Sequence, residues 1–265
     1  AGPCKGRRLM KKIMTVFGTR PEAIKMCPLE QELRARPSMD VTVCVTGQHR
    51  EMLRGVLDAF SVTPDYDLDI MQPGQTLYDI TTRVMTGMKT VIETVRPDMI
   101  LVHGDTTTTF SAALAAFYSG VPVGHVEAGL RTYDITSPYP EEFNRQAVDV
   151  ISQLLFAPTT LTRDNLLREG RNPSTVFVTG NTAIDALKTT VRPDYTHPEL
   201  EGFHGRLVLL TAHRRENLGA PMHRIFRAIR RVVEENPDIL VLYPIHMNPA
   251  VRAAAEAELA GCSRI

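Results

Sequence analysis

The segment from Leu101 to Arg145 constrains the fold of this chain more than any other. Two short apolar runs, at 99–103 and 121–126, flank a stretch long enough for a helix, and acids follow the runs, Asp105 and then Glu127. This order predicts a βαβ unit with two parallel strands. Because ligands bind outside the carboxyl ends of the strands in such sheets, we expect the two acids to share one cleft.

A further pair of acids, Glu141 and Glu142, begins the next predicted helix after a proline-rich loop. Carboxylates gathered in one cleft are typical of proton transfer. Simpler roles stay open, because Asp105 could cap the helix that follows it and Glu127 could be a solvated loop residue. Arg145 lies one helical turn after Glu141, where it could form a surface ion pair or contact a substrate.

The first predicted strand–helix turn is a candidate anion site. An apolar run at 12–17 is followed by Arg20 at the turn, Pro21 at the helix start and Lys25 one turn further on. A helix N-terminus with added cations suits phosphate, although Lys25 could simply lie on a solvated helix face. Neither a Walker A nor a GxGxxG motif occurs. Pro28 is expected to kink or break this helix.

Composition argues against partners held by bulk charge. The 30 basic and 30 acidic residues balance, so neither nucleic acid nor an anionic membrane surface is expected. No apolar run reaches the roughly 18 residues of a membrane span. The four cysteines form neither a CxxC pair nor a zinc-type spacing, which predicts reduced thiols in a cytoplasmic protein and no metal site.

Hydrophobic alternation predicts how the chain divides. Residues 1–9 read as an extension, residues 10–189 as one doubly wound domain with about six strands, and residues 190–205 as a linker. Residues 206–265 hold two predicted strands and two helices, which cannot cover both faces of a parallel sheet. We therefore expect a partial second domain, with about half of its α/β fold absent.

Two histidines follow the predicted strands of this second domain. His213 lies just past a strand end beside Arg214 and Arg215, an arrangement that suits phosphate. His246 has the same position after the next strand, but a loop histidine with ordinary hydrogen bonds is the favoured interpretation for it.

The motifs of residues 10 to about 250 resemble those of the non-hydrolysing UDP-N-acetylglucosamine 2-epimerases. The matching segments are GTRPEAIKM at 18–26, TGQHREML at 46–53, HGDTTTT at 103–109, GHVEAGLRT at 124–132, SPYPEEFNR at 137–145, TGNTAIDAL at 179–187, TAHRRENLG at 211–219 and YPIHMNP at 243–249.

The resemblance implies a GT-B-like α/β fold of two Rossmann-type domains with parallel sheets and with the substrate between them, the second domain being truncated here. It implies a homodimer that interconverts UDP-N-acetylglucosamine and UDP-N-acetylmannosamine for polysaccharide biosynthesis. UDP is eliminated to give a 2-acetamidoglucal and then added back with inverted C2, a route that needs neither nicotinamide nor metal. By the family's motifs, the acid–base candidates are Asp105, Glu127 and Glu141, and the substrate contacts are Arg20, Lys25, His213 and Arg145.

The resemblance also implies a possible second nucleotide-sugar site, at Gln48, Glu51, Gly74, Arg214 and His246. Members that use this site favour Gln and Arg where this chain has Glu51 and Gly74. Members are also longer, and the Gly-Gly loop and the acid that hold uridine and ribose in their later segment do not occur here. The alternatives are a GT-B glycosyltransferase, a hydrolysing epimerase and an inactive remnant.

Overall fold

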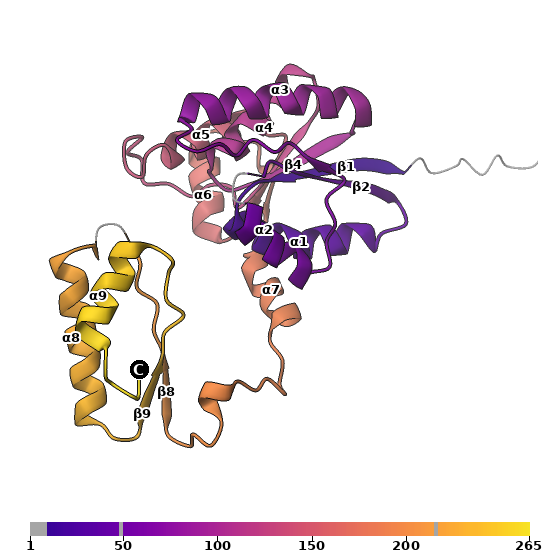
Figure 1. Ribbon diagram of the computed structural model, residues 1–265. Helices are drawn as coiled ribbons and strands as arrows, with labels where there is room; N and C mark the ends of the chain where they lie inside the picture. The colour runs from indigo at the N-terminus through magenta and orange to yellow at the C-terminus, as the bar shows by residue number, and fades with distance from the viewer. Residues whose placement is uncertain (1–9, 48–49, 215–216) are drawn as a thin grey trace, which may run out of the picture. The chain divides into compact units, whose positions relative to one another are not determined.

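The computed structural model describes residues 10–47, 50–214 and 217–265, without the side chains of residues 50–52. The chain divides after Arg192 into two compact units. Figure 1 shows the helices and strands of both. The elements of the first unit are β1 (Lys11–Phe17), α1 (Arg20–Arg34), β2 (Met39–Val45), α2 (Arg50–Ala59), β3 (Tyr66–Asp67), α3 (Leu77–Val95), β4 (Met99–His103), α4 (Thr107–Tyr118), β5 (Val123–Val126), α5 (Glu141–Ile151), β6 (Leu154–Ala157), α6 (Thr160–Arg168), the 3₁₀ turn Pro173–Thr175, β7 (Val176–Val178) and α7 (Thr182–Thr190).

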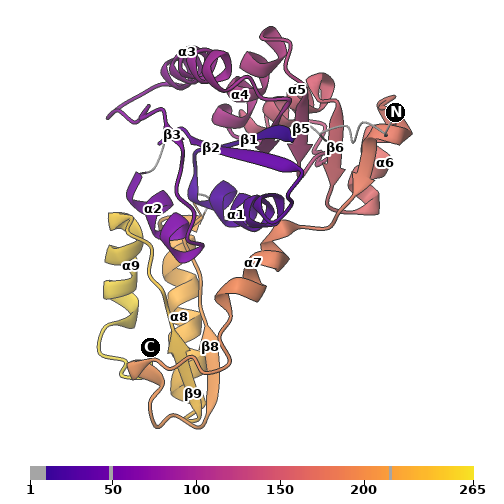
Figure 2. The same cartoon turned by 90° about the vertical axis from the view of Figure 1, so that its right-hand side faces the viewer.

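The first unit is built on a parallel sheet with the strand order β3-β2-β1-β4-β5-β6-β7. Helices α3, α4 and α5 cover one face and α1, α2 and α7 the other, as Figure 2 shows. Val84 and Met88 of α3 pack against Ile100 on the first face, and Ala23 and Met26 of α1 belong to the core on the second. Because both faces are covered, the strands read as continuous apolar runs.

The strand order places the switch point of the sheet between β1 and β4, which pair in parallel. Successive connections leave these two strands toward opposite faces, so the N-termini of α1 and α4 flank one crevice at their carboxyl ends. β5 pairs with β4 on the other side. Residues that follow β1, β4 and β5 therefore meet at one edge of the sheet.

The sheet has one strand more than the sequence predicts. The segment from Thr63 to Gln75, which is rich in proline and aspartate, contains β3, which adds a seventh strand to the expected six. Only Tyr66 and Asp67 pair with β2, so the strand is too short to leave a periodic pattern. In addition, Pro28 does not break α1, because the capped N-terminus of the helix and its buried residues on both sides of the proline outweigh one lost hydrogen bond.

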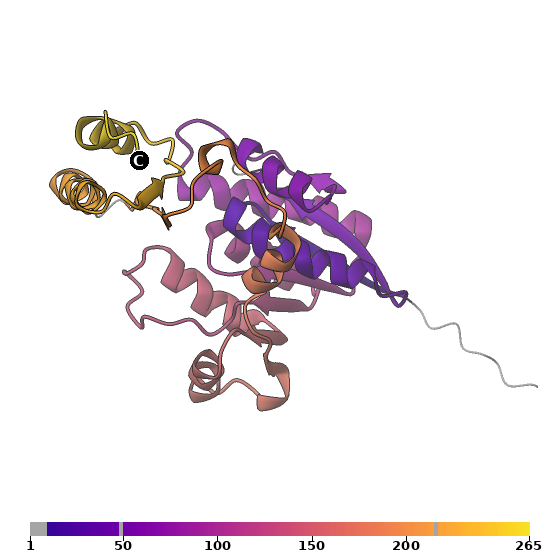
Figure 3. The ribbon, with the colours of Figure 1, turned by 90° about the horizontal axis from the view of Figure 1, so that it is seen from below.

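The second unit contains the 3₁₀ turn Pro198–Leu200, β8 (Arg206–Leu209), α8 (Ala220–Glu235), β9 (Ile239–Leu242) and α9 (Pro249–Leu259). β8 and β9 form a parallel pair, and Figure 3 shows α8 and α9 side by side against it. Its core includes Met222 and Phe226 of α8 and Val251 of α9. Leu207 and Leu209 of β8 are exposed.

Candidate active site

The three acids expected to act together are electrostatic neighbours in the first unit. Asp105 follows β4 after a Gly104 turn, Glu127 follows β5 directly, and Glu141 is the first residue of α5. The charges of Glu141 and Glu127 both act on Asp105 and raise its pKa. We call these three residues the acid cluster.

The surroundings of Asp105 raise the pKa of its carboxyl group. Burial is the main cause of its raised pKa, and the nearby Arg145 guanidinium offsets part of the effect. Arg145 Nη2 lies 2.9 Å from Asp105 Oδ2, and Asn144 Nδ2 donates to the Asp105 carbonyl at 2.9 Å. The alternative that Asp105 caps α4 is wrong, because Thr106 accepts the bond from the backbone N–H of Thr109.

Glu127 is held from several directions. Lys25 Nζ lies 2.5 Å from Glu127 Oε1, and Asn181 Nδ2 donates to the same oxygen at 3.1 Å. The Glu127 and Lys25 side chains are only 15% and 23% exposed, so neither the solvated loop residue nor the solvated helix face is observed. Glu127 has φ of 68°, in the left-handed region, which favours glycine over other residues. Strain of this kind at a non-glycine residue is common at functional sites.

A surface ion pair with Glu141, one of the two roles left open for Arg145, is not observed. Arg145 Nε instead donates to the backbone carbonyl of Glu141 at 3.4 Å, and its guanidinium lies between Asp105 and the fully buried Glu142. Two carboxylates, of which Glu142 is fully buried, attract the guanidinium more than the single carboxylate of Glu141 does. The i, i+4 rule could not reveal this, because Asp105 lies on another element.

Glu142 secures the loop that precedes α5. Burial by itself would raise its pKa, but hydrogen bonds from Gln146 and from the backbone of Thr132 and Tyr133 hold the pKa below its usual range. Tyr133 N donates to Glu142 Oε1 at 3.0 Å. From the sequence, Glu142 is only a companion of Glu141, although its place one residue into a helix is where an anion is favourable.

The backbone of the α1 N-terminus is less open to anions than the sequence suggests. Glu22 Oε2 accepts from Gly18 N at 2.9 Å and from Thr19 N at 2.7 Å, and Thr19 in turn caps Glu22 N. An internal carboxylate therefore already uses the N–H groups that a phosphate would need. The side chain of Arg20, exposed at the first helical position, is left as the anion contact of this turn.

Two buried groups near the acid cluster were missed by sequence reasoning. His103 ends β4, and its Nε2 lies 3.4 Å from Glu127 Oε2. Burial and the charge of Lys25 lower its pKa to about 3, so His103 is a neutral imidazole at physiological pH. Glu22 was read as part of a motif, but it also accepts from Thr106 and Thr109 at the start of α4.

The second unit brings together the two histidines that follow its strands. The rings of His213 and His246 stack with their centroids 5.0 Å apart and an angle of 25° between their planes. Asn248 N donates to His246 Nδ1 at 3.1 Å, so the simpler interpretation of a hydrogen-bonded loop histidine holds for that nitrogen. Gln48 and the side chain of Glu51 lie outside the described residues. The second nucleotide-sugar site stays a prediction.

Comparison with known proteins decides the family. The family profile for UDP-N-acetylglucosamine 2-epimerase matches residues 31–265. The curated UDP-N-acetylglucosamine 2-epimerase of Bacillus subtilis (strain 168) is 55% identical over 255 residues, which cover 96% of this chain and 67% of that protein. This chain belongs to the UDP-N-acetylglucosamine 2-epimerase family. It spans about two thirds of the length of the curated relatives that it matches.

Solved structures of the family share the fold. A UDP co-structure of S. aureus MnaA is 52% identical with a TM-score of 0.88, and covers 97% of this chain and 68% of its own. The Neisseria meningitidis enzyme bound to UDP-GlcNAc is 46% identical with a TM-score of 0.86, over 94% and 70%. The resemblance, the GT-B-like α/β class and the assignment to isomerases rather than transferases are thereby confirmed.

Within 10–47, 50–214 and 217–265 no cluster of three or more His, Cys, Asp or Glu side chains is arranged to hold a metal ion. In that part of the chain, no helix has both the length and the apolar character that crossing a bilayer requires.

Proposed function

We propose that this member of the epimerase family interconverts UDP-N-acetylglucosamine and UDP-N-acetylmannosamine by elimination and re-addition of UDP. The acid cluster is the observation that carries the proposal, because removal of a weakly acidic C2 proton needs a carboxylate held beside it. The ligands of the two solved relatives, UDP and UDP-GlcNAc, support the substrate class.

Asp105 is the group that we assign to the C2 proton. Its raised pKa makes it a stronger base than an exposed aspartate, and Arg145 holds its carboxylate in place. The electron pair of the broken C2–H bond forms the C1–C2 double bond as the C1–O bond breaks and UDP leaves. In the return step a UDP oxygen attacks C1 while a proton is delivered to the opposite face of C2, a task for Glu127 or Glu141.

The departing diphosphate needs positive charge, because negative charge develops on its oxygen as the C1–O bond breaks. We propose that Arg20, Lys25 and His213 supply this stabilisation. Lys25 is already placed by its contact with Glu127, and Arg20 is exposed at the start of α1. His213 is exposed in the second unit.

Hydrogen exchange at C2 tests the proposed reaction directly. Incubation of UDP-N-acetylglucosamine with the protein in heavy water should give both epimers with deuterium at C2, because the proton removed is replaced from solvent. Proton NMR and mass spectrometry measure the label. A glycosyltransferase would leave C2 unlabelled, and a hydrolysing enzyme would release free N-acetylmannosamine together with UDP. Either result would contradict the proposal.

Arg145→Gln should shift the pH dependence of the reaction. In the unaltered protein the Arg145 cation lowers the pKa of Asp105, so loss of this cation should raise the pKa of Asp105 further. Because the base must be ionised, the acid limb of the kcat/KM profile should move to higher pH. Arg163→Gln, which removes an exposed arginine paired with its neighbour Asp164, should leave the limb unchanged. A limb that stays in place or moves to lower pH in Arg145→Gln contradicts the assigned base.

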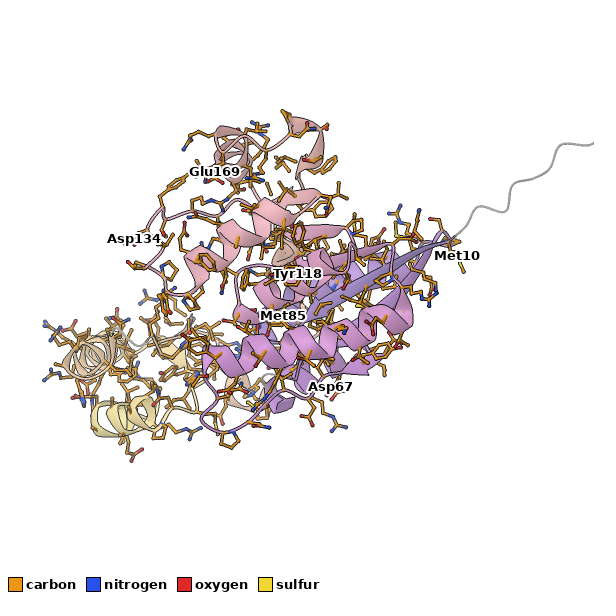
Figure 4. The ribbon with its side chains drawn as sticks, turned by 90° about the horizontal axis from the view of Figure 1, so that it is seen from above. Met10, Asp67, Met85, Tyr118, Asp134 and Glu169 are labelled. Carbon is orange, nitrogen blue, oxygen red and sulfur yellow. The ribbon has the colours of Figure 1, made fainter. Side chains whose placement is uncertain are left out.

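We further propose that the protein is a homodimer and works in the cytoplasm. Exposed aromatic residues at the end of α4, Phe117 and Tyr118, support self-association, as does a cavity of about 660 Å³ between the ends of α3 and α4. Figure 4 labels Met85 and Tyr118, which line this cavity. Light scattering should give about twice 29.5 kDa. The buried free thiols of Cys27 and Cys44 fit a reducing compartment.

A further inference from the structure

His125 is a buried histidine of β5 that the proposed mechanism does not use. Its side chain is fully buried, and each ring nitrogen faces an oxygen atom. Nδ1 lies 2.6 Å from Asp149 Oδ1, and Nε2 lies 2.7 Å from the Gly104 carbonyl oxygen. The carbonyl oxygen has no hydrogen to donate, so His125 must donate from Nε2.

The proton count at Nδ1 depends on the state of Asp149. Besides His125, this carboxylate faces Arg131 Nη2 at 2.8 Å and accepts from Gly129 N at 3.2 Å. Burial by itself would raise the pKa of Asp149, but the contacts with His125 and Arg131 hold it below its usual range. Because Arg131 Nη2 and Gly129 N are both donors, Asp149 meets them as an ionised carboxylate that only accepts, and His125 donates to it from Nδ1 as well.

An imidazolium at this depth needs charges that balance it. Asp149 supplies one negative charge. Arg131, on the other side of Asp149, also donates two hydrogen bonds to the Glu169 carboxylate, of 2.8 and 2.7 Å. His125 and Arg131 thus alternate with Asp149 and Glu169, and the four charges sum to zero. Figure 4 labels Glu169 at the outer end of this chain of charges.

The inner end of the same chain meets the turn that carries Asp105. Gly104 has φ of 70°, donates to the Val126 carbonyl at 2.9 Å and accepts from His125. Both backbone polar groups of Gly104 are therefore held by β5. Glycine adopts positive and negative φ about equally readily, so its own backbone preference does not fix this turn. The two hydrogen bonds to β5 therefore determine the position of Asp105.

We propose that His125 is a positioning residue in the imidazolium form, which fixes the Gly104–Asp105 turn and places a positive charge beside the Asp105 carboxylate. The proposal rests on the proposed role of Asp105 as the C2 base. The positive charge of His125, like that of Arg145, favours the ionised form of Asp105. The negative charges of Glu127 and Glu141 oppose ionisation. Four ionisable groups face His125 itself. Asp149 comes from α5, and Arg131 comes from the loop between β5 and α5. His103 and Asp105 come from the end of β4.

Nitrogen NMR of protein labelled with ¹⁵N-histidine tests the charge without any need for turnover. At pH 7.5 one histidine should show two protonated ring nitrogens, each with a one-bond coupling to a slowly exchanging proton. Its signals should be absent from His125→Gln and from His125→Asn, which assigns them. A neutral tautomer with one unprotonated nitrogen at position 125 would overturn the proposal, whatever the catalytic activity proves to be.

The same two variants separate charge from position. His125→Gln can still reach the Gly104 carbonyl but carries no charge, so kcat/KM should fall about tenfold at low pH as the acid limb moves to higher pH. His125→Asn can reach Asp149 but not Gly104, so misplacement should lower kcat by about 10²-fold at every pH. Equal losses in both variants, with an unmoved acid limb, would contradict a positioning role for the charge and indicate a packing role alone.

Discussion

Asp105→Asn is expected to lower the turnover number at least ~10²-fold, the lower end of the usual contribution from general acid–base catalysis. The amide has nearly the shape of the carboxylate but cannot take up the C2 proton. Asn144 bonds the backbone carbonyl of residue 105, so this anchor of the turn survives the substitution. The loss should therefore be in kcat, measured from formation of UDP-N-acetylmannosamine by chromatography.

Asp134→Asn is the matched control. Asp134 lies in the loop before α5, where Figure 4 labels it, and its carboxylate bonds Thr136 within the same turn. The same chemical change at this exposed position should leave turnover within about twofold, because surface changes away from special features have small effects. Near-normal turnover in folded Asp105→Asn would remove Asp105 from the mechanism and leave Glu127 and Glu141 as the candidates.

Glu22→Ala is expected to lower the free energy of unfolding by about 3–5 kcal/mol, more than any other single change considered. The buried carboxylate accepts from four donors, the backbone N–H groups of Gly18 and Thr19 and the hydroxyls of Thr106 and Thr109. Alanine would leave several of these donors buried without an acceptor. It would also separate the N-termini of α1 and α4, which flank the switch point of the sheet.

Asp79→Ala provides a comparison for this effect. Asp79 and Thr76 form the capping box of α3, as Glu22 and Thr19 do for α1. Asp79 is only half-buried, and its carboxylate bonds Thr76 within the same cap. Loss of an ordinary cap costs typically about 1 kcal/mol. Urea unfolding followed by circular dichroism would compare the two variants. Equal losses would show that the bridge from α1 to α4 adds nothing beyond helix capping.

The sequence carried most of the local organisation. Apolar runs with acids at their ends predicted β4, β5 and the position of Asp105 and Glu127, because hydrophobic periodicity and strand ends are properties of neighbouring residues. The family motifs supplied the reaction class, which no periodicity contains. Lys25 was placed on the correct helix, but the sequence could not show that its amine reaches Glu127, a residue 102 positions away.

The tertiary structure alone decided which charges meet. Arg145 pairs with the carboxylate of Asp105 rather than with that of Glu141, Glu22 accepts from the hydroxyls of Thr106 and Thr109 at the start of α4, and His125 reaches both Asp149 and Gly104. Each of these contacts depends on how separate elements pack, and on burial, which strengthens charge interactions and penalises unpaired groups. The sequence therefore determined the identity and order of the functional groups. Packing of the parallel sheet and its helices determined their partners and protonation states.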